Sequence, residues 1–105
     1  MPPHLLDIRR IAPGSFELAG ELDIETIEEF EEAFDEFAEA DGDVSFDVAG
    51  LTFIDSTGVR GFLALAQRLG GRSIKVRGAR ANVRRTLAIS GIDGHGGIRI
   101  VPDAD

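Results

Sequence analysis

Segments with the alternation of β-strands are interleaved with segments of helical periodicity, and this order restricts the fold more than any other feature of the chain. Residues 5–11 and 15–19 read as two strands joined by a turn at Ala12-Pro13-Gly14. The elements predicted after this hairpin alternate between helix and strand, over residues 24–40, 44–48, 56–69, 73–76, 79–90 and 98–101. Such alternation predicts an α/β fold in which a mixed sheet, antiparallel at its opening hairpin and parallel beyond it, is packed by helices.

The first predicted helix carries an apolar stripe on one face and acidic residues on the other. Its apolar residues recur at three- and four-residue steps: Ile24, Ile27, Phe30, Phe34, Phe37 and Ala38. Asp23 precedes it and is predicted to cap its first turn. No Lys or Arg lies between Asp23 and Asp43. The acidic face fits an ordinary solvated surface, and it also fits a surface that attracts a basic partner.

The strand at 44–48 and the helix at 79–90 are each predicted to end at a glycine. The strand at 44–48 is expected to bend at Ala49-Gly50 before an apolar stretch at 51–54 that leads to Asp55. In the helix at 79–90, Val83, Leu87 and Ile89 are expected to face inward, and Gly91 is expected to end it.

Length and composition indicate one soluble domain that spans residues 1–105. The chain is 43% hydrophobic and 29% charged, which is ordinary for a globular protein. It has no apolar run near the roughly 20 residues of a membrane span and no signal-peptide pattern, so a cytoplasmic protein without membrane insertion is expected. Cysteine is absent and there are only two histidines, His4 and His95, so no metal or other cofactor is predicted.

Charge is distributed unevenly along the chain. Residues 1–55 hold 16 acids and 2 bases, a net charge of −14, whereas residues 56–105 hold 3 acids and 9 bases, a net charge of +6. The overall charge of −8 disfavours nucleic acid as a partner, because a polyanion would be repelled. A protein partner is therefore expected.

The junction at residues 53–58, FIDSTG, carries the clearest local signal. A buried strand ends in Asp55, and two hydroxyl residues, Ser56 and Thr57, then open a helix. The N–H groups and dipole of a helix N-terminus favour negative charge, so a phosphate on either hydroxyl would be stabilised there. Asp55 is also a simple helix cap. Gly58 fits either a turn requirement or the close approach of a partner.

An enzymatic function is not predicted from these residues. Ser56 has no histidine beside it in the motif, and neither His4 nor His95 stands in a pattern that pairs with a serine nucleophile. We therefore expect a binding protein.

Four segments together resemble the STAS family, and within it the stand-alone anti-sigma factor antagonists, or anti-anti-sigma factors, of bacterial sporulation and stress pathways. The segments occur in the family's order: Gly20-Glu21-Leu22-Asp23, Asp47, FIDSTGV at 53–59, and Leu87-Ala88-Ile89-Ser90-Gly91-Ile92. The resemblance extends over nearly the whole chain. The resemblance implies the STAS-type mixed sheet packed by helices.

The resemblance also implies a partner switch controlled by phosphorylation. In the family, the hydroxyl after the motif's aspartate accepts phosphate from an anti-sigma factor of the serine kinase type. That residue here is Ser56, with Thr57 as the alternate acceptor. The unphosphorylated protein binds the anti-sigma factor and releases a sigma factor, phosphorylation breaks the complex, and a phosphatase resets it. The free protein is expected to be a monomer.

The partner-binding residues carried over from the family surround this phosphorylation site. They are Asp23, Asp55, Ser56, Thr57, Gly58 and Arg60. Arg60 departs from the small or apolar residue that close relatives often have, which leaves the partner's identity open.

A second function remains open at the level of sequence. STAS domains also act as scaffolds or regulatory subunits in stress-sensing complexes and in membrane transporters of lipids or anions. The short chain and the intact Asp-Ser-Thr-Gly motif favour the sigma pathway.

Overall fold

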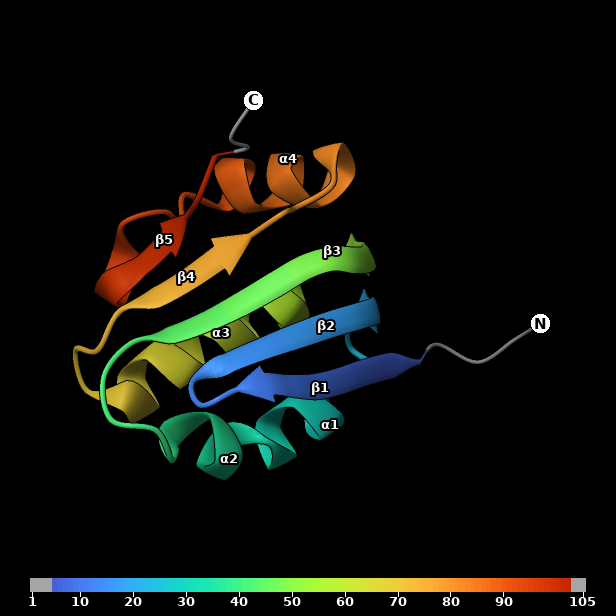
Figure 1. The fold of residues 1–105 in the computed structure, drawn as a ribbon. Coiled ribbons are helices and arrows are strands. Elements are labelled where there is room, and N and C mark those ends of the chain that lie inside the picture. The colour runs from blue at the N-terminus through green and yellow to red at the C-terminus, as the bar shows by residue number, and fades with distance from the viewer. Residues whose placement is uncertain (1–4, 103–105) are drawn as a thin grey trace.

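A five-stranded mixed sheet runs through the protein, with helices packed on one of its faces (Figure 1). The structure is a computed structural model and describes residues 5–102. The strands lie side by side in chain order: β1 (Leu6–Ala12), β2 (Ser15–Leu22), β3 (Val44–Ile54), β4 (Ile74–Arg77) and β5 (Ile98–Ile100). The helices are α1 (Ile27–Glu32), α2 (Phe34–Ala38), α3 (Ser56–Leu69) and α4 (Ala81–Ser90), and a short 3-10 turn, η1 (His95–Gly97), precedes β5.

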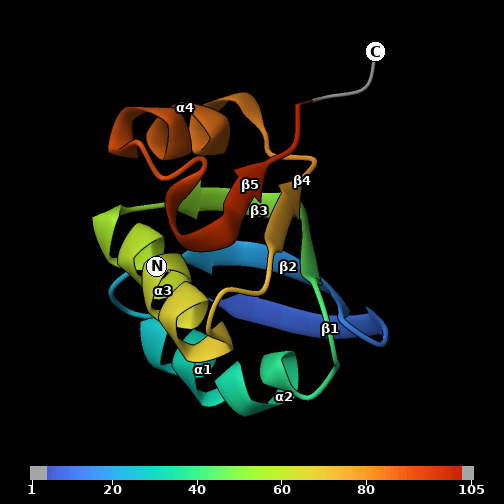
Figure 2. The same cartoon turned by 90° about the vertical axis from the view of Figure 1, so that its left-hand side faces the viewer.

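Strand directions confirm the predicted mixed sheet. The opening hairpin pairs β1 with β2 in antiparallel fashion, and the pairs from β2 to β5 are all parallel. Each parallel pair needs a crossover, which α1–α2, α3 and α4 supply. Figure 2 shows α3 crossing the sheet beside α1 and α2, and α4 at the other end of the molecule, where it packs on β3 and α3. The fold class is therefore the predicted one.

Phenylalanine rings from the sheet and the helices fill the core. Phe37 of α2 lies 4.8 Å from Phe16 and 4.9 Å from Phe46, measured between ring centroids, and Phe30 of α1 lies 5.1 Å from Phe62 of α3. These rings are fully buried. Edge-to-face pairs of this kind add to the hydrophobic gain of burial. The predicted stripe thus forms the contact between the first helical segment and the sheet.

The first helical segment is two short helices rather than the predicted single one. The segment α1 ends at Glu32, and α2 begins at Phe34 after Ala33, whose N–H bonds to Phe30 O at 3.2 Å. The bend lets Phe30 and Phe37 both reach Phe46, at 6.0 and 4.9 Å. Ile24 was expected to join the stripe but precedes α1, and 72% of its surface is exposed.

The strand at 44–48 does not end at Ala49-Gly50 as predicted. The strand β3 continues to Ile54, and its pairing with β2 slips at a bulge between Asp47 and Gly50. A Cβ on Gly50 would lie 3.0 Å from the Cβ of Ala19. The glycine therefore permits close contact between the strands rather than a bend that ends the strand.

In α4 the prediction for Ile89 is wrong. Val83 and Leu87 are buried as expected, but Ile89 is 80% exposed. It stands two residues after Leu87, which places it on the opposite side of a helix with 3.6 residues per turn. Gly91 ends the helix in the left-handed conformation with φ 70°, as predicted.

Candidate functional site

Asp55 caps the helix that presents Ser56 and Thr57, as the sequence predicts. It has extended backbone angles, φ −113° and ψ −174°, and its Oδ1 accepts a hydrogen bond from Gly58 N at 3.0 Å. Ser56, the first residue of α3, is exposed, whereas Thr57 is half-buried. The cap therefore fixes the backbone that carries the exposed hydroxyl.

The second carboxylate oxygen of Asp55 binds a different part of the chain. Its Oδ2 accepts from Ile24 N at 3.3 Å, and Asp55 N donates to Leu22 O at 3.3 Å. These bonds attach the loop after β2 to the start of α3. One carboxylate thus sets the helix start and holds the adjacent loop against it.

Asp23 has a different local role from the predicted one. The helix begins at Ile27 with Thr26 as its N-cap residue, so Asp23 does not cap it. Asp23 is 2% exposed, and its Oδ1 accepts from Glu25 N at 3.0 Å and from Thr26 N at 3.2 Å. It shapes the turn that precedes α1. Asp23 is therefore buried in a turn whose next residue, Ile24, is exposed.

Gly58 is buried where α3 passes the end of β2. A Cβ there would lie 2.5 Å from Leu22 O and 2.7 Å from Ile54 Cγ1. The sequence left open whether Gly58 serves a turn or the close approach of a partner. The structure shows a close approach, but of the protein's own backbone at Leu22. The glycine does not face solvent.

Ser56 lies beside a hollow between α3 and α4. The hollow has a volume of about 440 Å³ and is lined by Ser56, Val59, Arg60, Thr86, Ile89 and Ser90. Arg60 is exposed and stands one turn after Ser56 on the same face of α3. The structure therefore brings the phosphorylation candidate next to Arg60 and to the exposed apolar side chain of Ile89.

The sequence reasoning missed Ile24 and Ile89 as candidate surface residues. Both are apolar, and the sequence therefore predicts that they lie in the core. The helical period was the available signal for Ile89, since a residue two positions after buried Leu87 faces away from the core. No local sequence pattern predicts that Ile24 is exposed, because its position depends on the long-range hydrogen bond from its N–H to Asp55.

Metal binding has no candidate cluster in the described part of the chain. Within residues 5–102, His, Asp and Glu side chains form no group of three or more that could hold a metal ion. Nor is any helix among those residues long and apolar enough to cross a membrane.

Comparison with family models decides the classification. A model described as "Mlab, STAS domain" matches residues 9–102. The chain belongs to the STAS domain family. The resemblance of its motifs to that family is thereby confirmed. No curated protein matches the sequence at a significant level.

Solved structures share the fold of this STAS domain. An anti-sigma factor antagonist from Mycobacterium paratuberculosis has 20% sequence identity and a TM-score of 0.74, over 98% of this chain and 89% of that one. The anti-sigma factor antagonist SpoIIAA in its unphosphorylated form has 16% identity and a TM-score of 0.64, over 95% and 90%. The phosphorylated form of the Bacillus cell fate determinant SpoIIAA has 17% identity and a TM-score of 0.58, over 94% and 93%. At these identities the likeness concerns the fold.

Proposed function

We propose that this STAS domain is an anti-sigma factor antagonist whose binding to a kinase-type anti-sigma factor is switched by phosphorylation of Ser56. The observation that carries the proposal is the exposed Ser56 hydroxyl at the capped N-terminus of α3, beside an apolar hollow. Family membership and the antagonist structures of the same fold support it. The protein would act in the cytoplasm as a substrate and binding partner, and would catalyse nothing.

The N-terminus of α3 offers compensation for a phosphate. Asp55 satisfies Gly58 N through its carboxylate and Val59 N through its carbonyl. The N–H groups of Ser56 and Thr57 make no hydrogen bond within residues 5–102. They and the helix dipole would stabilise a phosphate at this position. Arg60, one turn along, supplies a positive charge within reach of residue 56.

A phosphate tolerated by the free protein would still oppose the complex. The surface around Ser56 includes exposed Ile24 and Ile89, which a protein partner would cover. A phosphoserine adds a charge of about −1.5 to −2 at pH 7, next to the carboxylate of Asp55. Removing that charge from water against a partner is costly. Loss of binding therefore requires no change of fold.

Exposure favours Ser56 over Thr57 as the phosphate acceptor. Ser56 is exposed at the mouth of the hollow, whereas Thr57 is half-buried in the first turn of α3. A kinase must reach the hydroxyl directly. We assign the switch to Ser56 and keep Thr57 as the alternate acceptor.

Phosphorylation and binding test the proposal together. The protein is incubated with ATP and each kinase-type anti-sigma factor of its own organism, then analysed by intact mass and peptide mapping. We expect the mass of one phosphate on the peptide that contains Ser56, none in Ser56→Ala, and normal labelling in the matched control Thr57→Val. Calorimetry should detect tight binding of the unphosphorylated protein and of Ser56→Ala, and at least tenfold weaker binding after phosphorylation.

Two outcomes would refute the proposed switch. The first is the absence of phosphate on Ser56 with every such kinase, and the second is a phosphorylated form that binds as well as the unphosphorylated one. Co-purification of the protein with an ABC transporter, without any kinase, would favour a scaffold or transporter subunit. A phosphatase that restores the unphosphorylated form completes the proposed cycle, and its activity is measured on the purified phosphoprotein.

A further inference from the structure

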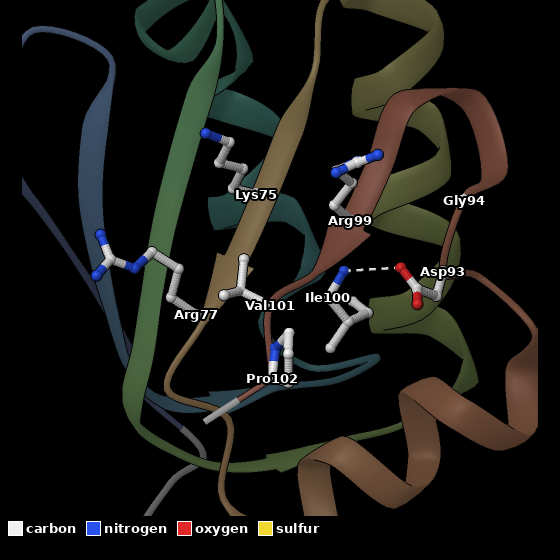
Figure 3. A pocket seen from close by; sticks show the side chains of 8 residues that line it. All are labelled: Lys75, Arg77, Asp93, Gly94, Arg99, Ile100, Val101 and Pro102. Carbon is white, nitrogen blue, oxygen red and sulfur yellow. Dashed lines mark hydrogen bonds between the residues drawn. The ribbon is translucent and has the colours of Figure 1, made fainter. Parts of the chain in front are cut away.

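Three cationic side chains gather on β4 and β5, on the face of the sheet turned away from the core. Ile74 and Val76 of β4 are buried, so the alternating residues Lys75 and Arg77 point to the other face, where both are exposed. Arg99 of β5 is exposed and stands opposite Lys75 in the strand register. Neighbouring strands are about 5 Å apart and alternate residues about 7 Å apart, so the three side chains leave the sheet within one small area. Figure 3 shows Lys75 and Arg77 extending toward β3 and Arg99 extending along β5, around the same hollow.

The three cations lack protein partners in the described part of the chain. Arg9 and Arg68 make ion pairs, with Glu17 at 2.6 Å and with Asp35 at 2.7 Å. By contrast, no side-chain hydrogen bond or ion pair is made by Lys75, Arg77 or Arg99 within residues 5–102. Yet the chain has 19 acids against 11 Lys and Arg residues. A cluster of cations that pair with no side chain of residues 5–102, in so acidic a protein, is available to an external anion.

These cations border a hollow of a size typical of small-molecule sites. Its volume is about 610 Å³, and its lining consists of Lys75, Arg77, Asp93, Gly94, Arg99, Ile100, Val101 and Pro102. Val101 and Pro102 add apolar side chains to this lining (Figure 3), whereas the side chain of Ile100, which stands opposite Val76 in the strand register, packs against the core. Binding sites for small ligands commonly span about 300–1,000 Å³ and combine apolar walls with a few polar groups.

Among residues 5–102, the acid that lines this hollow is Asp93, and the backbone holds its side chain. Asp93 Oδ1 accepts a hydrogen bond from Ile100 N at 2.9 Å, drawn as a dashed line in Figure 3. Among the lining residues within 5–102, three positive charges and one negative charge leave an excess of two positive charges. This balance matches an anion with two negative charges.

We propose that this hollow binds a small phosphate monoester with an apolar substituent. Guanidinium groups match the oxygen geometry of a phosphate, and an ammonium group adds a compact positive charge. The apolar substituent packs against Val101 and Pro102. The site lies across the sheet from the core that α3 covers, and it binds its ligand whether or not Ser56 is a phosphorylation site. The proposal is thus independent of the proposed function.

Phenyl phosphate is the first probe, titrated at constant ionic strength into the isotope-labelled protein and followed by amide NMR shifts. We expect saturable shifts centred on residues 75–77 and 99–102. Inorganic phosphate should bind the same residues more weakly, since it lacks the apolar group, and phenol should not bind. Arg77→Gln or Arg99→Gln should weaken phenyl phosphate binding by about tenfold, because each removes a charged donor. The matched control Arg85→Gln removes the same charge from an exposed site on α4 and should leave binding within about twofold.

Several results would overturn this assignment. Equal weakening by Arg85→Gln and Arg99→Gln would mean attraction by overall charge rather than a site. Shifts centred on α4, or no saturation at millimolar phenyl phosphate, would also refute it. Binding of an acidic peptide to the same residues, without any response to phosphate esters, would identify a protein surface instead. Each variant's thermal midpoint is measured alongside, so that a folding defect cannot imitate loss of the ligand.

Discussion

Gly58 connects the capped start of α3 to the end of β2, and Gly58→Ala tests whether packing alone explains this glycine. An alanine in a helix is ordinarily more favourable than glycine by about 0.5–1 kcal/mol. Here its Cβ would lie 2.5 Å from the carbonyl oxygen of Leu22 and 2.7 Å from Ile54 Cγ1, well inside van der Waals contact. Forcing such atoms apart costs about 1–3 kcal/mol, and backbone atoms relieve strain poorly. The net loss of unfolding free energy should be about 1–2 kcal/mol, or a lowering of Tm by roughly 5–10 °C.

Urea denaturation followed by far-ultraviolet circular dichroism measures this loss, since the protein has no Trp or Tyr for fluorescence. Gly61→Ala is the matched control in the same helix. Its Cβ would meet only side-chain atoms, at 2.7 Å from Ile27 Cδ1 and 3.2 Å from Phe30 Cδ2, and the end of a half-buried isoleucine can move. Gly58→Ala should therefore unfold at lower urea than Gly61→Ala. A urea midpoint for Gly58→Ala at or above that of the wild type would refute the packing argument. It would favour the other role considered for Gly58, the close approach of a partner.

Three further predictions concern the surface around Ser56. Asp55→Ala removes the cap and the acceptor of Ile24 N–H, so urea denaturation should reveal a loss of about 1–2 kcal/mol, whereas Ser56→Ala should stay within about 0.5 kcal/mol; equal losses would contradict the assigned cap. Ile89→Ser should change stability by less than about 0.5 kcal/mol, because the side chain is exposed, yet weaken anti-sigma factor binding in calorimetry; an unchanged dissociation constant would place the partner elsewhere. Phosphorylation of Ser56 should stabilise the free protein by about 0.5–1 kcal/mol in scanning calorimetry, and by less in Arg60→Gln, whereas a destabilised phosphoprotein would refute the compensation proposed at α3.

Local sequence signals sufficed where one short segment determines the structure. Asp55 was predicted to cap the following helix because an acid stood between a strand and a helix, and its bond to Gly58 N lies within the same turn. The left-handed glycine after α4 was predicted for the same reason. The order of strands and helices likewise followed from periodicity along the chain.

Long-range packing accounts for the features that the sequence did not predict. The break at Ala33 depends on Phe30 and Phe37 meeting one ring of the sheet, Phe46, and the apolar stripe is the same for one helix or two. Asp23 was expected to cap a helix, but the turn that it stabilises delays the helix to Ile27. The exposure of Ile24 depends on a contact 31 residues away.

The arrangement around Asp55 bears on how a phosphate at Ser56 would act. Both carboxylate oxygens of Asp55 are engaged, and they hold the helix start and the loop at Ile24 together. The hydroxyl of Ser56 makes no hydrogen bond within residues 5–102, so esterifying it breaks no bond of that part of the fold. A phosphate would then change the charge of a surface that is already formed, rather than move one of its elements. Under the proposed function, release of the partner follows from charge and desolvation at a fixed site, and α3 keeps its cap in both states.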